Sequence, residues 1–310
     1  MNIKVVSWNV RSLQKASNQA NILNYLSQFL SSSSIILLQE HHLKTAALEE
    51  LTSKTTFLIY STPHLLTLIS PSLYSQLQQP PTSLSSLHDR LLTTYLNLND
   101  GTSLEVGNLY APVKQELREP FFSNFRFAHR PCHLSLLAGD FNDCPNIKVD
   151  RKNQSNPITH WSKLEGNFPV QMIDTIRHRH PSRTLFTRPQ LDKKGGTVRS
   201  WSRIDHILLS TRHKSTLRDA HIRFDAPGSD HRPVVAVITL EQAVSTARLP
   251  STNSLIHRIS PLLFRNKAFA DEFRHYYETS ITPQTAHLPS NIGWEVKKKL
   301  IVDFAQRSAR

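Results

Sequence analysis

Short apolar segments recur through the first 240 residues, and polar stretches separate them. Residues 2–10 alternate between apolar and polar positions, whereas residues 35–38 form an unbroken apolar run that stops at Gln39-Glu40. Alternation predicts a strand with one buried face, and the unbroken run predicts a strand buried on both faces. Residues 18–30 place their apolar side chains on one helical face, with Ser17 as the expected cap. Strands that alternate with helices in this way indicate an α/β protein.

The same pattern continues as far as residue 240. Asn99-Asp100-Gly101 separates two alternating segments and predicts a hairpin turn. Three polar stretches, 70–86, 146–166 and 177–199, are expected to be loops. Further helices are expected at residues 45–53 and 114–128, and further strands at 57–60, 65–69, 91–98, 103–110, 133–138, 201–210, 221–224 and 234–240.

Polar side chains stand where the predicted strands end. The apolar run His133 to Ala138 stops at Gly139, and Asp140 and Asn142 follow with one residue between them. A rigid strand that ends in a glycine and then offers a carboxylate and a carboxamide is typical of an active-site edge. Because aspartate and asparagine are also common in turns, this segment alone fits a simple turn equally well. The other polar groups at strand ends are Asn9, Glu40, Tyr110, Asp205, Asp230 and His231.

Two of these carboxylates allow a first interpretation. Glu40 ends a buried strand, where it is either a ligand for a hard cation such as Mg²⁺ or a surface residue in a salt bridge. Asp205 lies inside an apolar strand, and a carboxylate there costs several kcal/mol unless it is paired. We expect Asp205 to have a buried histidine as its partner.

Composition limits the class of protein. The chain has 310 residues, of which 38% are hydrophobic, so it can bury one large core or two small ones. We expect no membrane span, because no apolar run reaches the ~18 residues that a span needs. The first ten residues lack the layout of a secretion signal, and two cysteines are too few for a disulfide framework. We therefore expect a protein of a reducing compartment that is not secreted.

The charge is strongly positive and unevenly placed. The net charge is +13, and residues 111–240 carry 21 basic against 12 acidic side chains. Such an excess suits a polyanion such as nucleic acid, although a solvated basic loop is the alternative. The basic residues are densest at Arg177, Arg179, Arg183, Arg188, Lys193, Lys194 and Arg199.

The polar groups at the strand ends favour one kind of chemistry. The sequence contains no nucleophile elbow, no CxxC or HExxH motif and no glycine-rich phosphate loop. The set instead offers oxygen ligands, one histidine and one phenol. Those groups suit metal-assisted attack of water on phosphorus, in which the cation neutralises the phosphate and a carboxylate aligns or deprotonates the water.

Six segments in order carry a resemblance to a known superfamily. They are Trp8-Asn9, Leu38-Gln39-Glu40, Asn108-Leu109-Tyr110-Ala111-Pro112, Gly139-Asp140-Phe141-Asn142, Ser202-Arg203-Ile204-Asp205-His206 and Ser229-Asp230-His231. Together they resemble the endonuclease/exonuclease/phosphatase superfamily, which includes relatives of apurinic/apyrimidinic endonucleases and deoxyribonuclease I. The resemblance implies a four-layered α/β sandwich, in which two mixed, mainly antiparallel sheets pack face to face with helices outside.

The resemblance also implies roles for single residues. It places Mg²⁺ (or Mn²⁺) on Glu40, with Asn9 nearby and Asp230 as a metal-side or structural ligand. It implies that Asp140 activates water, that Asn142 orients it, and that Tyr110 supports the phosphate. His231 would contact the scissile phosphate and be oriented by Asp205. The implied reaction is a phosphodiester nick that leaves a 3′-hydroxyl and a 5′-phosphate, with DNA as the partner, in the nucleus or the cytoplasm. The expected nucleic-acid contacts are Arg177, Lys193, Lys194, Arg199 and Arg203.

Finer features resemble the endonuclease of non-LTR (LINE-type) retrotransposons. Gln39-Glu40-His41-His42-Leu43 is similar to that group's QETHL segment, and Asp150-Arg151 follows at the group's usual interval. The segment from Ile173-Asp174 to Thr187 resembles another block of the group. We expect residues 1–240 to form the endonuclease domain. Residues 241–310 resemble a partly helical linker that leads to a reverse transcriptase, whose own motifs are absent.

Two departures from the family pattern keep other functions open. Arg11 stands where an aspartate or asparagine is usual, and Val113 stands where an asparagine is usual. A degenerate remnant that binds nucleic acid with weak or no catalysis is therefore one alternative. The others are a phosphatase or phospholipase of the same fold and an endonuclease for abasic sites.

Overall fold

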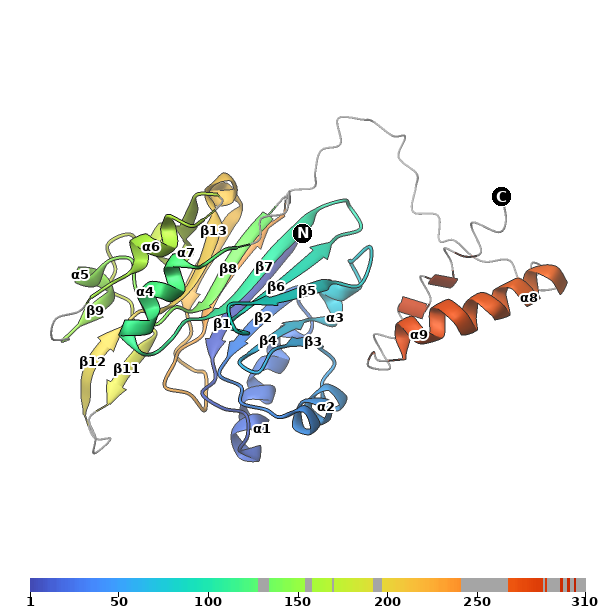
Figure 1. Ribbon diagram of the computed structural model, residues 1–310, viewed down its shortest axis with the longest axis horizontal. Coiled ribbons are helices and arrows are strands. Elements are labelled where there is room, and N and C mark those ends of the chain that lie inside the picture. Colours follow the sequence, from blue (N-terminus) through green and yellow to red (C-terminus); the bar gives the residue numbers. More distant parts are fainter. Residues whose placement is uncertain are drawn as a thin grey trace.

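The computed structural model describes most of the predicted endonuclease domain and part of the segment after it. The described residues are 1–127, 134–153, 158–168, 170–191, 197–240, 267–286, 288, 296–297, 300–301 and 304 (Figure 1). None of the described helices is long and apolar enough to cross a membrane. The predicted boundary near residue 240 falls beside residues outside the described set, so the division into two parts stays a prediction.

Two six-stranded sheets form the centre of the molecule (Figure 1). Strands β1 and β2 pair in parallel, as do β7 and β8, and the other paired strands of both sheets are antiparallel. In spatial order the first sheet contains β14 (Leu217–Ile222), β15 (Val234–Thr239), β1 (Asn2–Asn9), β2 (Ser34–Gln39), β4 (Leu65–Ile69) and β3 (Leu58–Ser61). The second contains β10 (Met172–Asp174), β13 (Asp205–Ser210), β8 (Leu134–Asp140), β7 (Ser103–Tyr110), β6 (Leu91–Asn97) and β5 (Thr82–Ser86).

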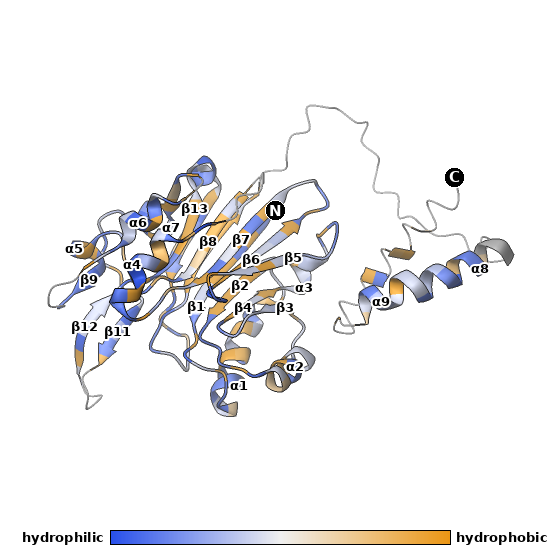
Figure 2. Ribbon diagram, viewed as in Figure 1, coloured by the Kyte–Doolittle hydropathy of each residue, from blue (hydrophilic) through white to orange (hydrophobic). Residues whose placement is uncertain are grey.

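Apolar side chains fill the space between the sheets. Val5 and Leu37 of the first sheet belong to the same buried cluster as Val106 and Leu136 of the second. Successive residues of a strand point to opposite faces, so Val6 packs instead with the helices outside the first sheet. Central strands such as β7 and β8 are accordingly largely hydrophobic (Figure 2).

Helices complete the outer layers. On the first sheet, α1 (Ala16–Leu26), the short η1 (Ser27–Phe29) and α2 (Thr45–Lys54) contribute to the outer cluster. On the second, α4 (Gln115–Ser123) and α6 (Trp161–Glu165) contribute Phe122 and Trp161, which pack with Leu137. The layers confirm the expected fold class of two mixed, mainly antiparallel sheets packed face to face with helices outside.

A small third sheet lies at one end of the sandwich (Figure 1). It pairs β11 (Arg188–Leu191) with β12 (Val198–Ser202), and β12 with β9 (Arg151–Lys152). In contrast to the central strands, these three strands are mostly hydrophilic (Figure 2). The remaining described elements are α3 (Pro71–Tyr74), α5 (Ile147–Asp150), α7 (Thr175–Arg179), η2 (Thr211–Thr216), α8 (Lys267–Tyr276), η4 (Tyr277–Ile281) and α9 (Thr282–Thr285).

The structure corrects several boundaries. The expected loop at 70–86 contains α3 and the edge strand β5, whose polar side chains give no apolar alternation because the strand is held through its backbone ladder with β6. The expected loop at 177–199 contains most of the β11–β12 hairpin. The expected strand 201–210 is two strands, interrupted at Arg203 and Ile204. Ser17 lies inside α1 and not at its cap, which is Lys15.

Candidate active site

The strand ends of both sheets meet at one point, and Asn9 joins them. Asn9 ends β1, Glu40 follows β2, and Asp140 ends β8. The Nδ2 atom of Asn9 donates to Glu40 Oε1 at 2.7 Å and to Asp140 Oδ2 at 2.9 Å. Three side chains that lie far apart in the sequence therefore form one connected group across the two sheets.

His231 and Asp205 form the other half of the cluster. Asp205 lies opposite Asp140 in the antiparallel pair of β13 and β8. His231 Nδ1 lies 3.0 Å from both carboxylate oxygens of Asp205 and 4.0 Å from Asp140 Oδ2. The indole N–H of Trp8 donates to the main-chain oxygen of His231 at 3.0 Å, which fixes the backbone of the histidine. The expected pairing of Asp205 with a buried histidine is thus present.

Burial and charge determine which of these groups are ionised. Burial, with the neighbouring Asp205 carboxylate, raises the pKa of Asp140 to about 6. Burial would lower the pKa of His231, but the Asp205 carboxylate outweighs it and raises that pKa to about 9. Near neutral pH, therefore, Asp140 is a carboxylate and His231 is a cation.

We expect the metal-free protein to lose stability as the pH rises from 6.5 to 9. The pKa of His231 is raised from 6.5 to about 9, so the folded chain keeps a proton that the unfolded chain releases. This contribution is complete below pH 6.5 and is lost as the pH rises through 9, on the order of 3 kcal/mol in total. Urea unfolding in the presence of a chelator, at half-unit steps of pH, measures it.

Asp205→Asn is the control for this titration. The substitution removes the carboxylate that raises the pKa of His231, so the decline between pH 6.5 and 9 should flatten. Asp140 ionises below this range, with a pKa of about 6, and does not obscure the result. Equal slopes in the two proteins would contradict the assignment of the charged pair.

The turn after β8 is rigid. Gly139 has φ +152°, and a Cβ atom there would lie 1.9 Å from the carbonyl oxygen of Leu109, so no other residue fits. The N–H of Asn142 donates to Asp140 Oδ1 at 2.8 Å, and its amide group donates to the carbonyl oxygen of Ala111 at 2.9 Å. The guanidinium of Arg118 donates to the carbonyl oxygen of Asn142. These contacts fix the direction of the Asp140 carboxylate.

Glu40 is the carboxylate that fits a divalent cation best. Its side chain is 18% exposed, whereas Asp140 and Asp205 are fully buried. Burial would raise the pKa of Glu40, but hydrogen bonds from Asn9 and Tyr110 outweigh it and hold the pKa below its ordinary value. An ionised, partly accessible carboxylate beside a carboxamide is a suitable oxygen donor set for Mg²⁺ or Mn²⁺.

A second group of metal-ligating atoms belongs to the buried cluster. Ligand atoms of Asp140, Asp205 and His231 lie within 4.8 Å of one another. Asp205 and His231 already bind each other, and the group is buried, so it is less accessible to a cation than the partly exposed Glu40. Tyr110 borders the site as a neutral phenol, since burial and the Glu40 carboxylate raise its pKa, and the Arg90 guanidinium lies 4.8 Å from its ring centroid.

Asp230 lies outside the carboxylate cluster. Its Oδ2 atom is 2.7 Å from the Arg11 guanidinium and 3.6 Å from Arg188 Nε. Of the two expected roles of Asp230, metal-side ligand or structural ligand, the pairing with two arginines favours the structural one. The Arg11 guanidinium neutralises the Asp230 carboxylate, so Asp230 does not add an uncompensated negative charge beside the cluster.

Arg203 is not a surface contact for nucleic acid, contrary to expectation. Its side chain is 0% exposed, and Nε donates to Asp150 Oδ1 at 2.9 Å while Nη1 binds Asp174. His206 Nδ1 joins the same network, 2.7 Å from Asp174 Oδ2. Burial would raise the pKa of Asp174, but Arg203 and His206 outweigh it and hold that pKa well below its ordinary value. Asp150 and Asp174 both lie in segments that resemble the LINE-type group, but their spacing along the chain does not predict that their side chains meet.

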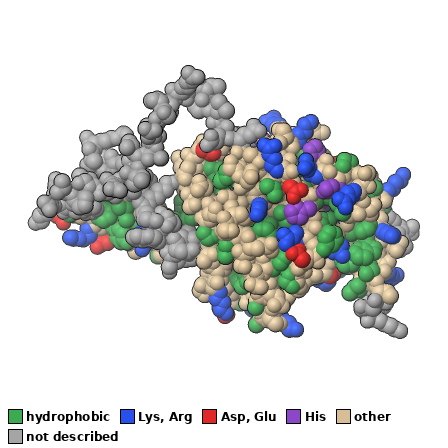
Figure 3. Space-filling view, turned by 180° about the vertical axis from the view of Figure 1, so that it is seen from behind, with side chains coloured by type: hydrophobic (Ala, Val, Ile, Leu, Met, Phe, Trp, Pro, Cys, Tyr) green, Lys and Arg blue, Asp and Glu red, His purple; other side chains and the backbone are tan. Residues whose placement is uncertain are grey.

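The remaining expected contacts differ in accessibility. Arg177 binds Asp150 and three main-chain carbonyl groups, and 22% of its side chain is exposed, so its donors serve the fold. Arg199 is exposed on β12. Lys193 and Lys194 lie outside the described residues. On the face shown in Figure 3, histidine and carboxylate side chains lie among several lysines and arginines, as expected of a surface that binds a polyanion.

Known proteins support the same fold. The model of the Endonuclease/Exonuclease/phosphatase family matches residues 6–231. No curated protein matches the chain in sequence. The AP endonuclease LMAP from Leishmania major is similar in structure, with a TM-score of 0.59 and 16% identity over 77% of this chain and 88% of that one.

Two further solved structures are similar over nearly their whole length. An AP endonuclease from Archaeoglobus fulgidus has a TM-score of 0.57 and 17% identity, and covers 77% of this chain and 100% of its own. The 3′ phosphatase NExo from Neisseria, bound to a product DNA hairpin, has a TM-score of 0.52 and 19% identity, and covers 76% of this chain and 99% of its own.

Proposed function

The chain belongs to the endonuclease/exonuclease/phosphatase family, and on that premise we propose that it is a metal-dependent endonuclease that nicks one strand of DNA. The nick leaves a 3′-hydroxyl and a 5′-phosphate. The observation that carries the proposal is the group formed by Asn9, Glu40 and Asp140 opposite the pair of His231 and Asp205. The structural neighbours named above as AP endonucleases, and as a phosphatase bound to a DNA hairpin, support DNA as the substrate.

Each side chain has a distinct task in the proposed reaction. Asp140, fixed by the N–H of Asn142, orients the attacking water and accepts its proton. The His231 imidazolium, held through Nδ1 by Asp205, presents its other ring nitrogen to the scissile phosphate and stabilises the charge that develops there. The Tyr110 phenol supports the phosphate. A cation held by Glu40, with Asn9 nearby, supplies neutralisation of the phosphate charge when it is bound.

We further propose that the enzyme is of the LINE-type retrotransposon class. The blocks that resemble this class contribute Asp150, Asp174 and Arg177, and these side chains form one ion-pair network with Arg203 of the superfamily block. In this proposal residues 1–240 are the catalytic domain, and residues 241–310 connect it to a neighbouring segment. The 3′-hydroxyl would then serve as a primer, in the nucleus or the cytoplasm.

Abasic-site cleavage is the second candidate, because two of the similar structures are AP endonucleases. Three substrates separate the candidates: an intact duplex, the same duplex with one abasic site, and soluble phosphomonoesters or phosphodiesters such as inositol phosphates. Strong preference for the abasic duplex would favour the second candidate. Release of phosphate from the soluble esters, without nicking, would favour a phosphatase.

We expect the purified chain to convert supercoiled plasmid to the open-circular form with Mg²⁺ and to stop when a chelator is added. Glu40→Gln should raise the Mg²⁺ concentration for half-maximal nicking by about tenfold or more, because the substitution removes the accessible charged ligand. Glu50→Gln is the matched control, since Glu50 is exposed in α2 and its side chain pairs with Lys54. Extension of the nick by a polymerase tests for the 3′-hydroxyl. A wild-type chain that fails to nick would overturn the proposed function.

A further inference from the structure

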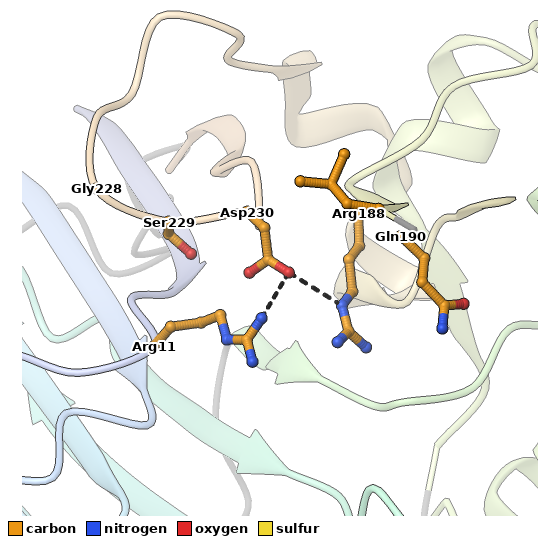
Figure 4. A pocket seen from close by; sticks show the side chains of 7 residues that line it. Arg11, Arg188, Gln190, Gly228, Ser229 and Asp230 are labelled. Carbon is orange, nitrogen blue, oxygen red and sulfur yellow. Dashed lines mark hydrogen bonds and ion pairs between the residues drawn. The ribbon is translucent and has the colours of Figure 1, made fainter. Parts of the chain in front are cut away.

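A pocket of about 410 Å³ opens beside the catalytic cluster (Figure 4). One wall is Arg11, the second is the loop Gly228–Asp230, and the third is the base of β11 with Arg188, Gln190 and Leu191. The volume is within the range of sites for small ligands, so the pocket has room for a sugar-phosphate unit.

The pocket carries a net positive charge that is held in place. The guanidinium groups of Arg11 and Arg188 approach the same oxygen of Asp230, at 2.7 Å and 3.6 Å (Figure 4). Two cations therefore share one carboxylate, which leaves one positive charge for a ligand. Arg188 Nε and Asp230 Oδ1 are buried atoms without a hydrogen-bond partner among the described residues. A buried donor without a partner is costly, so the site is suited to an incoming acceptor.

The pocket and the catalytic cluster are built from the same two loops. The N–H of Arg11 donates to Asn9 Oδ1 at 3.0 Å. The hydroxyl of Ser229 donates to the carbonyl oxygen of Asn9 at 2.7 Å and accepts the N–H of His231 at 3.0 Å. The pocket therefore adjoins the position at which His231 would meet the scissile phosphate.

We propose that this pocket binds a phosphate group of the cleaved strand next to the scissile phosphate, and this proposal rests on the proposed function. Guanidinium groups bind phosphate oxygens with paired N–H donors, and two arginines on one carboxylate present such donors already oriented. Asp230 is a positioning residue in this arrangement. Arg11 then acts as a substrate contact that the usual aspartate or asparagine of the family cannot provide.

The salt dependence of DNA binding tests the pocket without any catalysis. A 30-base-pair duplex is titrated with the protein in a chelator at salt concentrations from 50 to 200 mM. The double variant Arg11→Ala/Arg188→Ala should bind about tenfold more weakly at the lower salt, and the slope of log K against log salt should fall by about 0.9, the value for one phosphate contact. Arg218→Ala is the matched control, because Arg218 is exposed on β14 and binds Thr239.

A chemical substitution in the DNA locates the contact. The cleavage site in the duplex is first mapped with Mg²⁺. Intact duplexes with a single uncharged methylphosphonate, placed in turn at positions on each side of that site, should then show one position that weakens binding by the wild type. The same position should have no further effect on Arg11→Ala/Arg188→Ala. Urea unfolding midpoints are measured for all variants, including the milder pair Arg11→Gln/Arg188→Gln. Unchanged midpoints exclude misfolding as the cause of the weaker binding.

Three outcomes would contradict the proposal that the pocket binds a phosphate group. One is a slope for the double variant equal to that of Arg218→Ala. Another is a methylphosphonate effect that persists unchanged in the double variant. The third is an increase of affinity in Arg11→Asn, which would make Arg11 an impairment and not a contact. A normal slope change in a chain that fails to nick would overturn the proposed function alone, so the two failures are distinguishable.

Discussion

Asp140→Asn is expected to lower the rate of DNA nicking about 10³-fold and to leave the chain folded. The substitution keeps the shape of the side chain and removes the negative charge that would accept a proton from water, a loss that typically costs 10²-fold to 10⁴-fold. Asp140 is buried, and both of its oxygens are already bound within the cluster. Single-turnover nicking at saturating DNA measures the chemical step.

The stability of the same variant separates a catalytic role from a structural one. Burial raises the pKa of Asp140, so removing the charge relieves an unfavourable ionisation in the folded chain. An asparagine has one acceptor oxygen where the carboxylate accepts two N–H groups, so the free energy of unfolding should fall by about 1–3 kcal/mol at most and the chain should stay folded. Asp219→Asn, on the exposed side of β14, is the control and should nick normally. An Asp140→Asn protein with full activity would remove this residue from the mechanism.

Arg203→Met is expected to lower the free energy of unfolding by about 3–5 kcal/mol, because it leaves two buried carboxylates without their shared cation. Asp150 is fully buried and Asp174 is 9% exposed, so water cannot replace the guanidinium. Urea unfolding at pH 7 measures the change. Combining Arg203→Met with Asp150→Asn and Asp174→Asn should recover much of the loss, since no buried charge then stands alone.

This variant also decides between the two interpretations of Arg203. A surface arginine that contacts DNA would change affinity and salt dependence and leave stability within about 0.5 kcal/mol of the wild type. Arg212→Met, an exposed arginine in η2, is the matched substitution for that comparison. A stable Arg203→Met protein with weakened DNA binding would contradict the buried network.

The sequence predicts the fold best where the burial of a residue can be read from the pattern of apolar residues around it. Continuous apolar runs such as 35–38 predict buried strands, and the structure places that run in the centre of the first sheet. The edge strand β5 is not predictable in this way, because Thr82–Ser86 has no apolar alternation and pairs with β6 through its backbone. Periodicity reports burial, and an exposed strand carries little of it.

The sequence predicts which residues form the site better than it predicts which of them contact one another. The strand-end pattern and the family resemblance brought together Glu40, Asp140, Asp205 and His231, because chemistry of this kind gathers where strands end. The partners of Arg203 lie 53 and 29 residues away at Asp150 and Asp174, and although both lie in LINE-like segments, no local pattern pairs them with Arg203. Arg11 and Asp230 are 219 residues apart, so the pocket they form exists only in the folded chain.

The position of β15 in the first sheet has a consequence for the synthesis of the protein. β15 inserts between β14 and β1, so the second strand partner of β1 is made more than 220 residues after β1 itself. On the ribosome, the apolar strand that contains Val5 and Val6 has an open hydrogen-bonding edge until Val234–Thr239 has emerged. A nascent chain interrupted before that point exposes an unpaired strand edge, which is a template for aggregation.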